Sequence, residues 1–538
     1  MTTLICAAIM VDDPEQGLGD AHAARLAGAD LVEFRIDRLF HGEGDDEGAA
    51  DTLRLVTQSP LPCIVTCRPT YEGGEYDGDD SARISLFESL GASDHPPRYI
   101  DVEHQAYARS ANLRQKVYLA IDHPAQVRDL STGLILSAHD FDKRPSDLLG
   151  TLASMRESEA AKIVKLAWRA RSLRDNIELL ELIRERDRPM IALGMGEFGL
   201  LSRVLAPKFG GFLTFAGVRE RGVTAPGQPT IRELLETYRF RSIGAETRVY
   251  GVMGWPVAHS IGPQVHNAGF DAFQHDGVYL PMPIAEGWES FKATVLSLLD
   301  AEWLGFRGAS VTIPHKEHLV RLAREDTSRT WRVDPLVERL GAANTISVQD
   351  DGGVWVSNTD AHGAIAPILR ALERDDLPGV RVGVLGSGGA ARAVLGGAID
   401  AGADISVFAR SLDKAKALVY HLGGRAHTLD AIGDIELDVL VNCTPLGMAG
   451  GPDPDASPID REALRGSRAL VMDTVYRPLE TPLLQDSREL GLRVIDGSEM
   501  FVAQACAQFE TWTGVPSHDS HTLFGRIARD FLSNMSED

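Results

Sequence analysis

The chain has 538 residues and carries 54 lysines and arginines against 77 aspartates and glutamates, a formal net charge of −23. Its length indicates more than one domain, and 44% hydrophobic with 24% charged residues is typical of a globular protein, which excludes a disordered or fibrous chain. The acidic balance also disfavours nucleic acid and anionic membrane surfaces as partners.

The first 220 residues contain eight short apolar runs separated by segments of helical period. These strand candidates cover residues 4–9, 31–36, 63–67, 99–102, 134–138, 163–167, 190–193 and 212–218. Apolar strands that alternate with helices indicate a parallel sheet covered on both faces, and eight such units predict an α/β fold with a closed (β/α)8 TIM barrel. A ninth apolar run, Val117–Ile121, is assigned to a helix because Leu113, Val117 and Ile121 recur at helical spacing.

A second βα series begins at Val249–Val252, after the pattern loses its periodicity near Arg239–Thr247. Further on, the strand Val382–Leu385 leads into a glycine-rich turn and a helix, which is typical of a Rossmann nucleotide-binding domain. The sequence therefore predicts a barrel over residues 1–240, a substrate-binding lobe over 248–350 that is completed by about 500–538, and a Rossmann domain over 351–499.

The five cysteines, at positions 6, 63, 67, 443 and 506, form no Cys-x-x-Cys pair. An odd number is a poor basis for a disulfide framework, so a reducing cytoplasm is the expected location. The N-terminal segment has no basic leader, and the longest uncharged stretch is broken by prolines and glycines, so neither a signal peptide nor a membrane helix is expected.

Charged residues stand at the predicted C-terminal ends of the barrel strands, where such barrels carry their active sites. They are Glu33, Arg35, Arg68, Glu103, His139 and Lys165. A lysine among apolar strand residues loses hydration and becomes a nucleophile toward ketones, although an ion-paired structural lysine fits the same pattern. His139 ends the preceding strand, where an imidazole shuttles protons or merely packs.

Six motifs of this half, in their order along the chain, resemble type I 3-dehydroquinate dehydratase. They are Glu33–Asp37, Thr66–Arg68 with Glu72–Gly74, Ser137–Phe141, Lys165, Ser202-Arg203 and Ala225–Gln228. The resemblance implies that Lys165 forms an imine with the substrate ketone, that His139 moves the α-proton to the leaving hydroxyl, and that Glu72 orients His139. It implies substrate binding by Glu33, Arg35, Arg68 and Arg203, and by Thr224 and Gln228 on a loop that closes as a lid.

The glycine-rich turn of the second half is suited to a pyrophosphate, because small residues let backbone N–H groups approach it. The predicted contacts are Gly386, Ser387, Gly388, Gly389 and Ala390. The next strand ends in Ala409-Arg410-Ser411 and lacks the acidic residue that NAD-binding domains place there. This favours NADP, with Arg410, Ser411 and Lys414 binding the 2′-phosphate, although a solvated strand-end arginine is the alternative.

Residues 248–530 resemble shikimate dehydrogenase. The motifs are Gly254–Ser260, Val311–Lys316, Gly341–Thr345, Asn358–Asp360, Asn442–Met448 and Gln504. The resemblance implies a catalytic pair of Lys316 and Asp360, where a plain salt bridge is the alternative. It also implies that Asn344, Thr312 and Gln504 hold the ring hydroxyls and that Ser260 holds the carboxylate. Tyr476 is expected to contact the substrate, and Thr444, Val475 and Gly497 are expected to contact the cofactor.

Gly262 departs from the family pattern, which has a second carboxylate-binding serine at this position. The space left by the missing hydroxymethyl group suggests that the site accepts quinate, which carries one hydroxyl more than shikimate. No metal-ligand cluster stands out, and imine chemistry needs none. The sequence thus predicts a bifunctional enzyme of aromatic amino acid biosynthesis that dehydrates 3-dehydroquinate and reduces the product with NADPH. The alternatives are a quinate/shikimate dehydrogenase acting in the catabolic direction and a non-catalytic metabolite sensor.

Overall fold

A computed structural model describes residues 2–122, 131–219, 227–258, 260–465, 467–517 and 522–535. The chain divides into two compact units: Met1–Thr247 with Leu280–Pro283 and Ser297–Trp303, and Arg248–Tyr279 with Ile284–Leu296 and Leu304–Asp538. Among the described residues, no helix is long and apolar enough to cross a membrane.

The first unit is built on eight parallel strands. They are β1 (Leu4–Met10), β2 (Leu31–Arg35), β3 (Cys63–Thr66), β4 (Tyr99–Glu103), β5 (Gly133–Asp140), β6 (Ala161–Arg169), β7 (Met190–Met195) and β8 (Leu213–Ala216). Each strand pairs with the next along the chain from β1 to β7, and β8 returns to pair with β1. The Phe212 N–H also donates to the Met190 carbonyl at 2.8 Å, which brings β7 and β8 together. The predicted barrel fold is confirmed.

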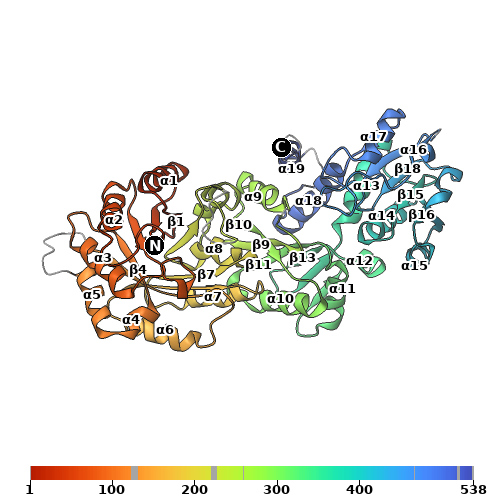
Figure 1. Ribbon diagram of the computed structural model, residues 1–538. Helices are drawn as coiled ribbons and strands as arrows, with labels where there is room; N and C mark the ends of the chain where they lie inside the picture. The colour runs from red at the N-terminus through yellow and green to blue at the C-terminus, as the bar shows by residue number, and fades with distance from the viewer. Residues whose placement is uncertain are drawn as a thin grey trace. The chain divides into compact units, whose positions relative to one another are not determined.

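Helices lie outside the strands of this unit (Figure 1). They are α1 (Pro14–Ala27), α2 (Asp46–Gln58), α3 (Asp80–Ala92), α4 (His104–Arg109), α5 (Ala111–Ile121), α6 (Leu148–Glu157), α7 (Asp175–Arg184) and α8 (Leu200–Val204). An aspartate begins four of them by accepting a backbone N–H of the first turn, at positions 13, 45, 79 and 147. The apolar run Val117–Ile121 lies in α5, as predicted. Short turns of helix occur at η1 (Thr70–Glu72), η2 (Glu197–Gly199), η3 (Ala206–Phe209), η4 (Glu233–Thr237) and η5 (Phe240–Ser242).

The second unit begins with a six-stranded mixed sheet in the order β10-β9-β11-β13-β14-β12. Its strands are β9 (Arg248–Gly254), β10 (Gly277–Pro283), β11 (Phe306–Val311), β12 (Trp331–Val333), β13 (Thr345–Val348) and β14 (Val354–Ser357). The helices of this lobe are α9 (Gly262–Ala272), α10 (Trp288–Asp300), η6 (Glu302–Leu304), α11 (Lys316–Glu325), α12 (Pro335–Leu340) and α13 (Thr359–Leu372). The antiparallel pairing of β13 with β11 and β14 distinguishes this sheet from the other two.

A second six-stranded sheet is wholly parallel and has the order β17-β16-β15-β18-β19-β20. Its strands are β15 (Arg381–Leu385), β16 (Asp404–Ala409), β17 (Arg425–Thr428), β18 (Val439–Asn442), β19 (Leu470–Asp473) and β20 (Val494–Ile495). The order reverses between β15 and β18, and open α/β sheets bind their ligands at such a reversal. The remaining helices are α14 (Gly389–Asp400), α15 (Leu412–Leu422), η7 (Leu429–Asp434), α16 (Arg461–Leu464), α17 (Pro482–Glu489), α18 (Gly497–Thr513) and α19 (Leu523–Met535).

Candidate active sites

Lys165 lies on β6 inside the barrel and is 5% exposed. Its Nζ donates to Asp101 Oδ2 at 2.8 Å, lies 3.7 Å from Glu33 Oε1, and sits 4.6 Å from the centre of the Phe215 ring. Asp101 is fully buried on β4, and the positive charges of Arg68 and Lys165 hold its pKa well below the usual range despite that burial. The lysine is therefore paired with a buried, ionised carboxylate, and its side chain does not reach toward solvent.

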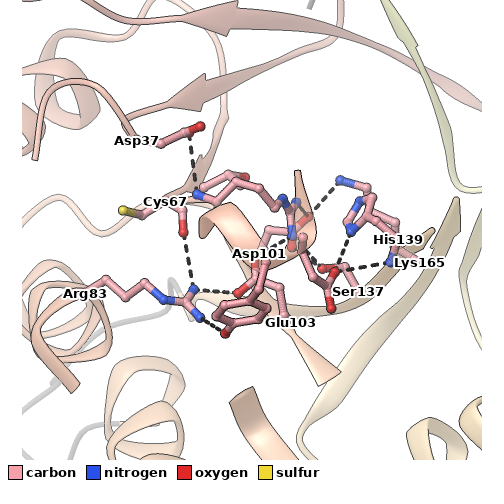
Figure 2. A network of polar contacts seen from close by, with 12 residues as sticks. Asp37, Cys67, Arg83, Asp101, Glu103, Ser137, His139 and Lys165 are labelled. Carbon is pink, nitrogen blue, oxygen red and sulfur yellow. Dashed lines mark hydrogen bonds and ion pairs between the residues drawn. The ribbon is translucent and has the colours of Figure 1, made fainter. Parts of the chain in front are cut away.

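Arg68 follows β3 and links Asp101, the partner of Lys165, to a second buried carboxylate, Glu103. Figure 2 labels Lys165, Asp101 and Glu103 in this network. The Arg68 guanidinium lies 3.1 Å from Asp101 Oδ2 and 2.5 Å from Glu103 Oε1, and it donates to Ser137 Oγ at 2.9 Å. Ser137 in turn donates to Asp101 Oδ1 at 2.5 Å. The alternation of opposite charges compensates each group for its lost hydration.

His139 and Glu72 form a second pair at the end of β5. Glu72 Oε2 accepts the main-chain N–H of His139 at 3.1 Å and faces its Nδ1 at 2.9 Å. Burial, with the positive charges of Arg68 and Lys165, lowers the pKa of His139 well below its usual value, so the imidazole is neutral at pH 7. Burial and the charge of Glu103 raise the pKa of Glu72 to about 8. With Nδ1 held by Glu72, Nε2 is the nitrogen available as a base.

Two arginines of the predicted substrate set differ in their pairing. Arg35 is held by Asp37 through two hydrogen bonds of 2.9 and 2.7 Å. Arg203 on α8 is 2% exposed and donates from Nε to the Gly194 carbonyl at 3.0 Å, while its buried Nη1 has no hydrogen-bond partner among the described residues. Burial lowers the pKa of Arg203 to about 10. A buried guanidinium with an unused donor is suited to an anion.

The remaining predicted barrel residues lie in three places. Glu33 is buried on β2 and accepts from Thr66 Oγ1 at 2.7 Å, which turns its carboxylate toward Lys165. Gln228 is buried after β8. Thr224 lies outside the described residues.

In the second unit, the predicted pair is brought together by two helix starts. Lys316 is the first residue of α11, Asp360 lies in the first turn of α13, and Lys316 Nζ donates to Asp360 Oδ2 at 2.6 Å. Asn358 caps α13 by accepting the N–H groups of Asp360 and Ala361, at 3.0 and 3.3 Å. The cap fixes the backbone that carries Asp360, so the short Asn358–Asp360 motif positions its own carboxylate.

Polar side chains continue from this pair along β13 and α18. Asn344 Oδ1 accepts the Thr359 N–H at 2.8 Å, and the Asn344 carbonyl accepts from Gln508 Nε2 at 3.2 Å. Gln508 Oε1 accepts a hydrogen bond from Ser310 Oγ at 2.7 Å. Ser310 Oγ in turn accepts one from Tyr279 Oη at 2.6 Å. Gln504 is half-buried one turn earlier on α18, and Thr312 follows β11.

Gly262 opens α9 beside Ser260, whose Oγ accepts the Gly262 N–H at 3.2 Å. A Cβ at Gly262 would lie 3.3 Å from Ser260 Oγ and 3.4 Å from Tyr279 Oη. Tyr279 Cε1 would be nearer still, at 3.2 Å, so any side chain larger than hydrogen at this position would require its neighbours to shift.

The glycine-rich turn lies between β15 and α14, at the reversal of strand order. Gly386 has φ +106°, a left-handed conformation that favours glycine, while a Cβ at Gly388 would meet nothing within 4 Å. Gly388 caps α14 without a side-chain hydrogen bond, so the first N–H groups of the helix are open to an anion. Ser387 belongs to this turn, and Gly389 and Ala390 are the first two residues of α14.

Arg410, Ser411 and Lys414 lie after β16 and are exposed. Ser411 caps α15 by accepting the Lys414 N–H at 3.4 Å. Among the described residues, neither Arg410 nor Lys414 forms an ion pair, so both charges are available to a phosphate.

Hydrogen bonds connect the loops that follow β18 and β19. Asp473 accepts from Asn442 Nδ2 and from the Val475 N–H, both at 3.0 Å, and Asn442 accepts the Thr444 N–H at 2.9 Å. Gly497 at the start of α18 lies against this loop, since a Cβ there would be 2.1 Å from the Val475 carbonyl oxygen. The Tyr476 ring packs on Phe501, with 5.2 Å between centroids. These contacts hold Thr444, Val475 and Gly497 in one group of neighbouring loops.

Comparison with known proteins covers both units. The family model for type I 3-dehydroquinase matches residues 5–245, that for the shikimate dehydrogenase substrate binding domain matches 252–346, and that for the shikimate 5'-dehydrogenase C-terminal domain matches 497–516. The bifunctional 3-dehydroquinate dehydratase/shikimate dehydrogenase, chloroplastic, of Arabidopsis thaliana is 37% identical over 537 residues, which cover 96% of this chain and 83% of the relative. This chain belongs to that bifunctional family.

The dehydrogenase half also matches single-function relatives. The shikimate dehydrogenase (NADP(+)) of Methanocella arvoryzae is 38% identical over 291 residues, covering 53% of this chain and 99% of the relative. A solved shikimate 5-dehydrogenase from Thermus thermophilus, in complex with NADP(H) and shikimate, is 31% identical, covers 53% of this chain and 99% of that chain, and has a TM-score of 0.44. The dehydroquinate dehydratase and shikimate dehydrogenase of S. pombe AroM is 22% identical, covers 98% of both chains, and has a TM-score of 0.42.

Sequence reasoning missed several residues of the dehydratase half. Asp101, which touches both Lys165 and Arg68, received no role, and Glu103 was noted as a strand-end charge without a function. Their spacing was the available signal, because residues two apart on a strand face the same side. No sequence pattern indicated Arg83, because this residue lies on helix α3 and not on a barrel strand, and contacts Glu103 from there.

Proposed function

We propose that this bifunctional enzyme dehydrates 3-dehydroquinate to 3-dehydroshikimate in its barrel and reduces 3-dehydroshikimate to shikimate with NADPH in its second half, as a step of aromatic amino acid biosynthesis. The observation that carries the proposal is a buried lysine beside a buried base, Lys165 and the His139–Glu72 pair, in one barrel. If Lys165 had a structural role alone, neither the neutral imidazole of His139 nor the unpartnered buried Nη1 of Arg203 would be needed in the same barrel.

In the dehydratase reaction, the Lys165 amine attacks the substrate ketone and water leaves as the imine forms. His139 Nε2 takes the α-proton while the imine accepts the electron pair, and the proton then leaves with the β-hydroxyl group as water. Hydrolysis of the imine frees the amine. Asp101 lies 2.8 Å from Nζ, so it holds the lysine side chain in place before the attack. The same carboxylate balances the positive charge of the nitrogen when that charge is present.

Substrate binding in the barrel is assigned to the groups that surround Lys165. Arg203 binds the carboxylate with its unused donors, and Arg68, Arg35 and Glu33 face the hydroxyl groups. Gln228, which is buried after β8, is assigned to the same site.

In the reductase reaction, the Lys316 ammonium donates a proton to the carbonyl oxygen of 3-dehydroshikimate, and Asp360 holds the lysine in place at 2.6 Å. Asn344, Thr312 and Gln504 hold the ring hydroxyls, and Ser260 holds the carboxylate. NADPH supplies the hydride.

The residues present fit NADP. Gly386 and the open α14 terminus leave room for a pyrophosphate, and Arg410 and Lys414 offer unpaired charges beyond β16 for a 2′-phosphate. Thr444, Val475, Tyr476 and Gly497 would form the rim near the nicotinamide. The solved relative named above carries NADP(H) and shikimate.

A coupled assay tests the whole proposal. Purified protein receives 3-dehydroquinate and NADPH, and NADPH oxidation is followed in the wild type, in Lys165→Ala and in Lys316→Ala. We expect oxidation after a lag, loss of oxidation in Lys165→Ala with recovery on adding 3-dehydroshikimate, and no recovery in Lys316→Ala. A wild type that consumes no NADPH even with 3-dehydroshikimate would exclude the reductase and favour a metabolite sensor.

Quinate is a second candidate substrate, on the observation at Gly262. Ser260 Oγ and Tyr279 Oη lie 3.3 and 3.4 Å from the place that a Cβ of residue 262 would take, so both oxygens face this position and could bond an extra hydroxyl group of the substrate. Comparable kcat/KM values for quinate and shikimate in the oxidative direction would support a catabolic role. Undetectable quinate turnover would exclude it, and Gly262→Ser should then change shikimate oxidation alone.

The proposed partners are therefore small carboxylic acids and NADP. All five cysteines are free and buried. The cytoplasmic location and the domain boundaries at 240, 248, 350 and 499 stay predictions.

A further inference from the structure

Glu103 holds two guanidinium groups at once. Its Oε1 lies 2.5 Å from Arg68 Nη1 and its Oε2 lies 2.5 Å from Arg83 Nη1, and all three side chains are 3% exposed or less. The carboxylate is thus shared between an arginine of the proposed substrate site and an arginine that comes from outside the barrel wall (Figure 2). A buried carboxylate in this arrangement fixes both partners.

Arg83 is anchored on its outer side as well. The guanidinium donates to the Cys67 carbonyl at 3.2 Å and to Asp80 Oδ1 at 2.6 Å, and Tyr71 Oη accepts from it at 3.2 Å. Asp80 also contacts Arg109, which is 55% exposed, at 3.2 Å. A row of alternating charges therefore leads from the surface through Arg83 and Glu103 to Arg68.

We propose that Glu103 and Arg83 are positioning residues of the dehydratase site, which fix Arg68 against Asp101 and set the charge that the Glu72–His139 pair experiences. The proposal rests on the proposed dehydratase activity. Neither residue is assigned a contact with the substrate; both act through Arg68 and through the electrostatic field of the cavity.

The field argument depends on every charge that faces Glu72. These charges are Arg68 after β3 and Asp101 and Glu103 on β4, while the neutral His139 on β5 contributes its main-chain N–H. Glu103 opposes the ionisation of Glu72, and Arg83 compensates Glu103. Glu103→Gln should therefore ease ionisation of Glu72, while Arg83→Gln leaves Glu103 less compensated and should hinder it.

The test measures dehydratase kcat and KM against pH in the full-length protein, because the pH dependence of kcat/KM reports groups of the free enzyme. We expect the acidic limb to move to lower pH in Glu103→Gln and to higher pH in Arg83→Gln, each by about one pH unit. The double variant should return the limb toward the wild-type position. KM for 3-dehydroquinate should rise about 10- to 100-fold in all three, because Arg68 is no longer fixed.

Arg109→Gln is the matched control, since it loses a contact with Asp80 but none with Glu103. It should leave the profile and KM unchanged. Arg83→Lys keeps the charge and should restore the pH limb but not KM, which separates the electrostatic effect from misfolding. Limbs that stay in place, or that move in the same direction in both single variants, would refute the assignment. A wild type without dehydratase activity would refute the proposed function and, with it, this proposal.

Discussion

Replacing Arg203 by methionine should stabilise the barrel and weaken its binding of 3-dehydroquinate. Burial lowers the pKa of Arg203 to about 10, so keeping this guanidinium charged in the folded protein costs about 3 kcal/mol. Its hydrogen bond to the Gly194 carbonyl returns about 1 kcal/mol, which leaves about 2 kcal/mol of destabilisation. The pKa values of the folded and unfolded states both lie above neutrality, so the penalty is the same from pH 6 to pH 8.

Differential scanning calorimetry of the full chain measures this change. For a domain of this size, about 2 kcal/mol raises the Tm of the barrel transition by about 4–8 °C. KM for 3-dehydroquinate should meanwhile rise at least about 100-fold, because a charge-assisted carboxylate pair is lost. Arg188→Met is the control: its guanidinium donates to the carbonyls of Ser158, Ala161 and Arg156, so its loss should lower the Tm. A lower Tm in Arg203→Met would refute the reasoning.

Three further predictions concern other residues. The pKa of Glu72, raised to about 8, should place the acidic limb of dehydratase kcat/KM near pH 8, and this limb should disappear in Glu72→Gln; an unchanged limb would contradict the assignment. Arg410→Ala should raise KM for NADPH about 10- to 100-fold and leave KM for NADH unchanged, whereas equal effects on both cofactors would exclude a 2′-phosphate contact. Gly497→Ala places a Cβ 2.1 Å from the Val475 carbonyl oxygen, so NADPH binding measured by fluorescence should weaken at least tenfold, and wild-type affinity would show that α18 shifts freely.

The regular parts of the chain could be predicted because each strand repeats one pattern. A strand buried on both faces is continuously apolar, so the eight runs of the first half stand out, and the end of each run marks the position of a polar side chain. Lys165 and His139 stand out for this reason. The Arg410 prediction used a similar rule, the absence of an acid at a strand end.

The network around Lys165 could not be predicted in full, because its members come from elements far apart in the sequence. Asp101 belongs to a strand with two acids, and which of them meets the lysine depends on the register of β4 against β5 and β6. Arg83 belongs to a helix, where an arginine is ordinary, and its burial follows from the packing of α3 against the barrel. Tertiary packing determines such contacts, and no local pattern reports them.

The pairing of Lys165 with Asp101 has a consequence for chemical selectivity. Nζ of Lys165 donates to Asp101 at 2.8 Å and lies 3.7 Å from Glu33 Oε1, so a carbonyl group must compete with two carboxylates for this nitrogen. A ligand with polar groups that replace these contacts has an advantage over a small aldehyde that has none. The two carboxylates therefore favour larger, polar carbonyl compounds as reaction partners of the lysine.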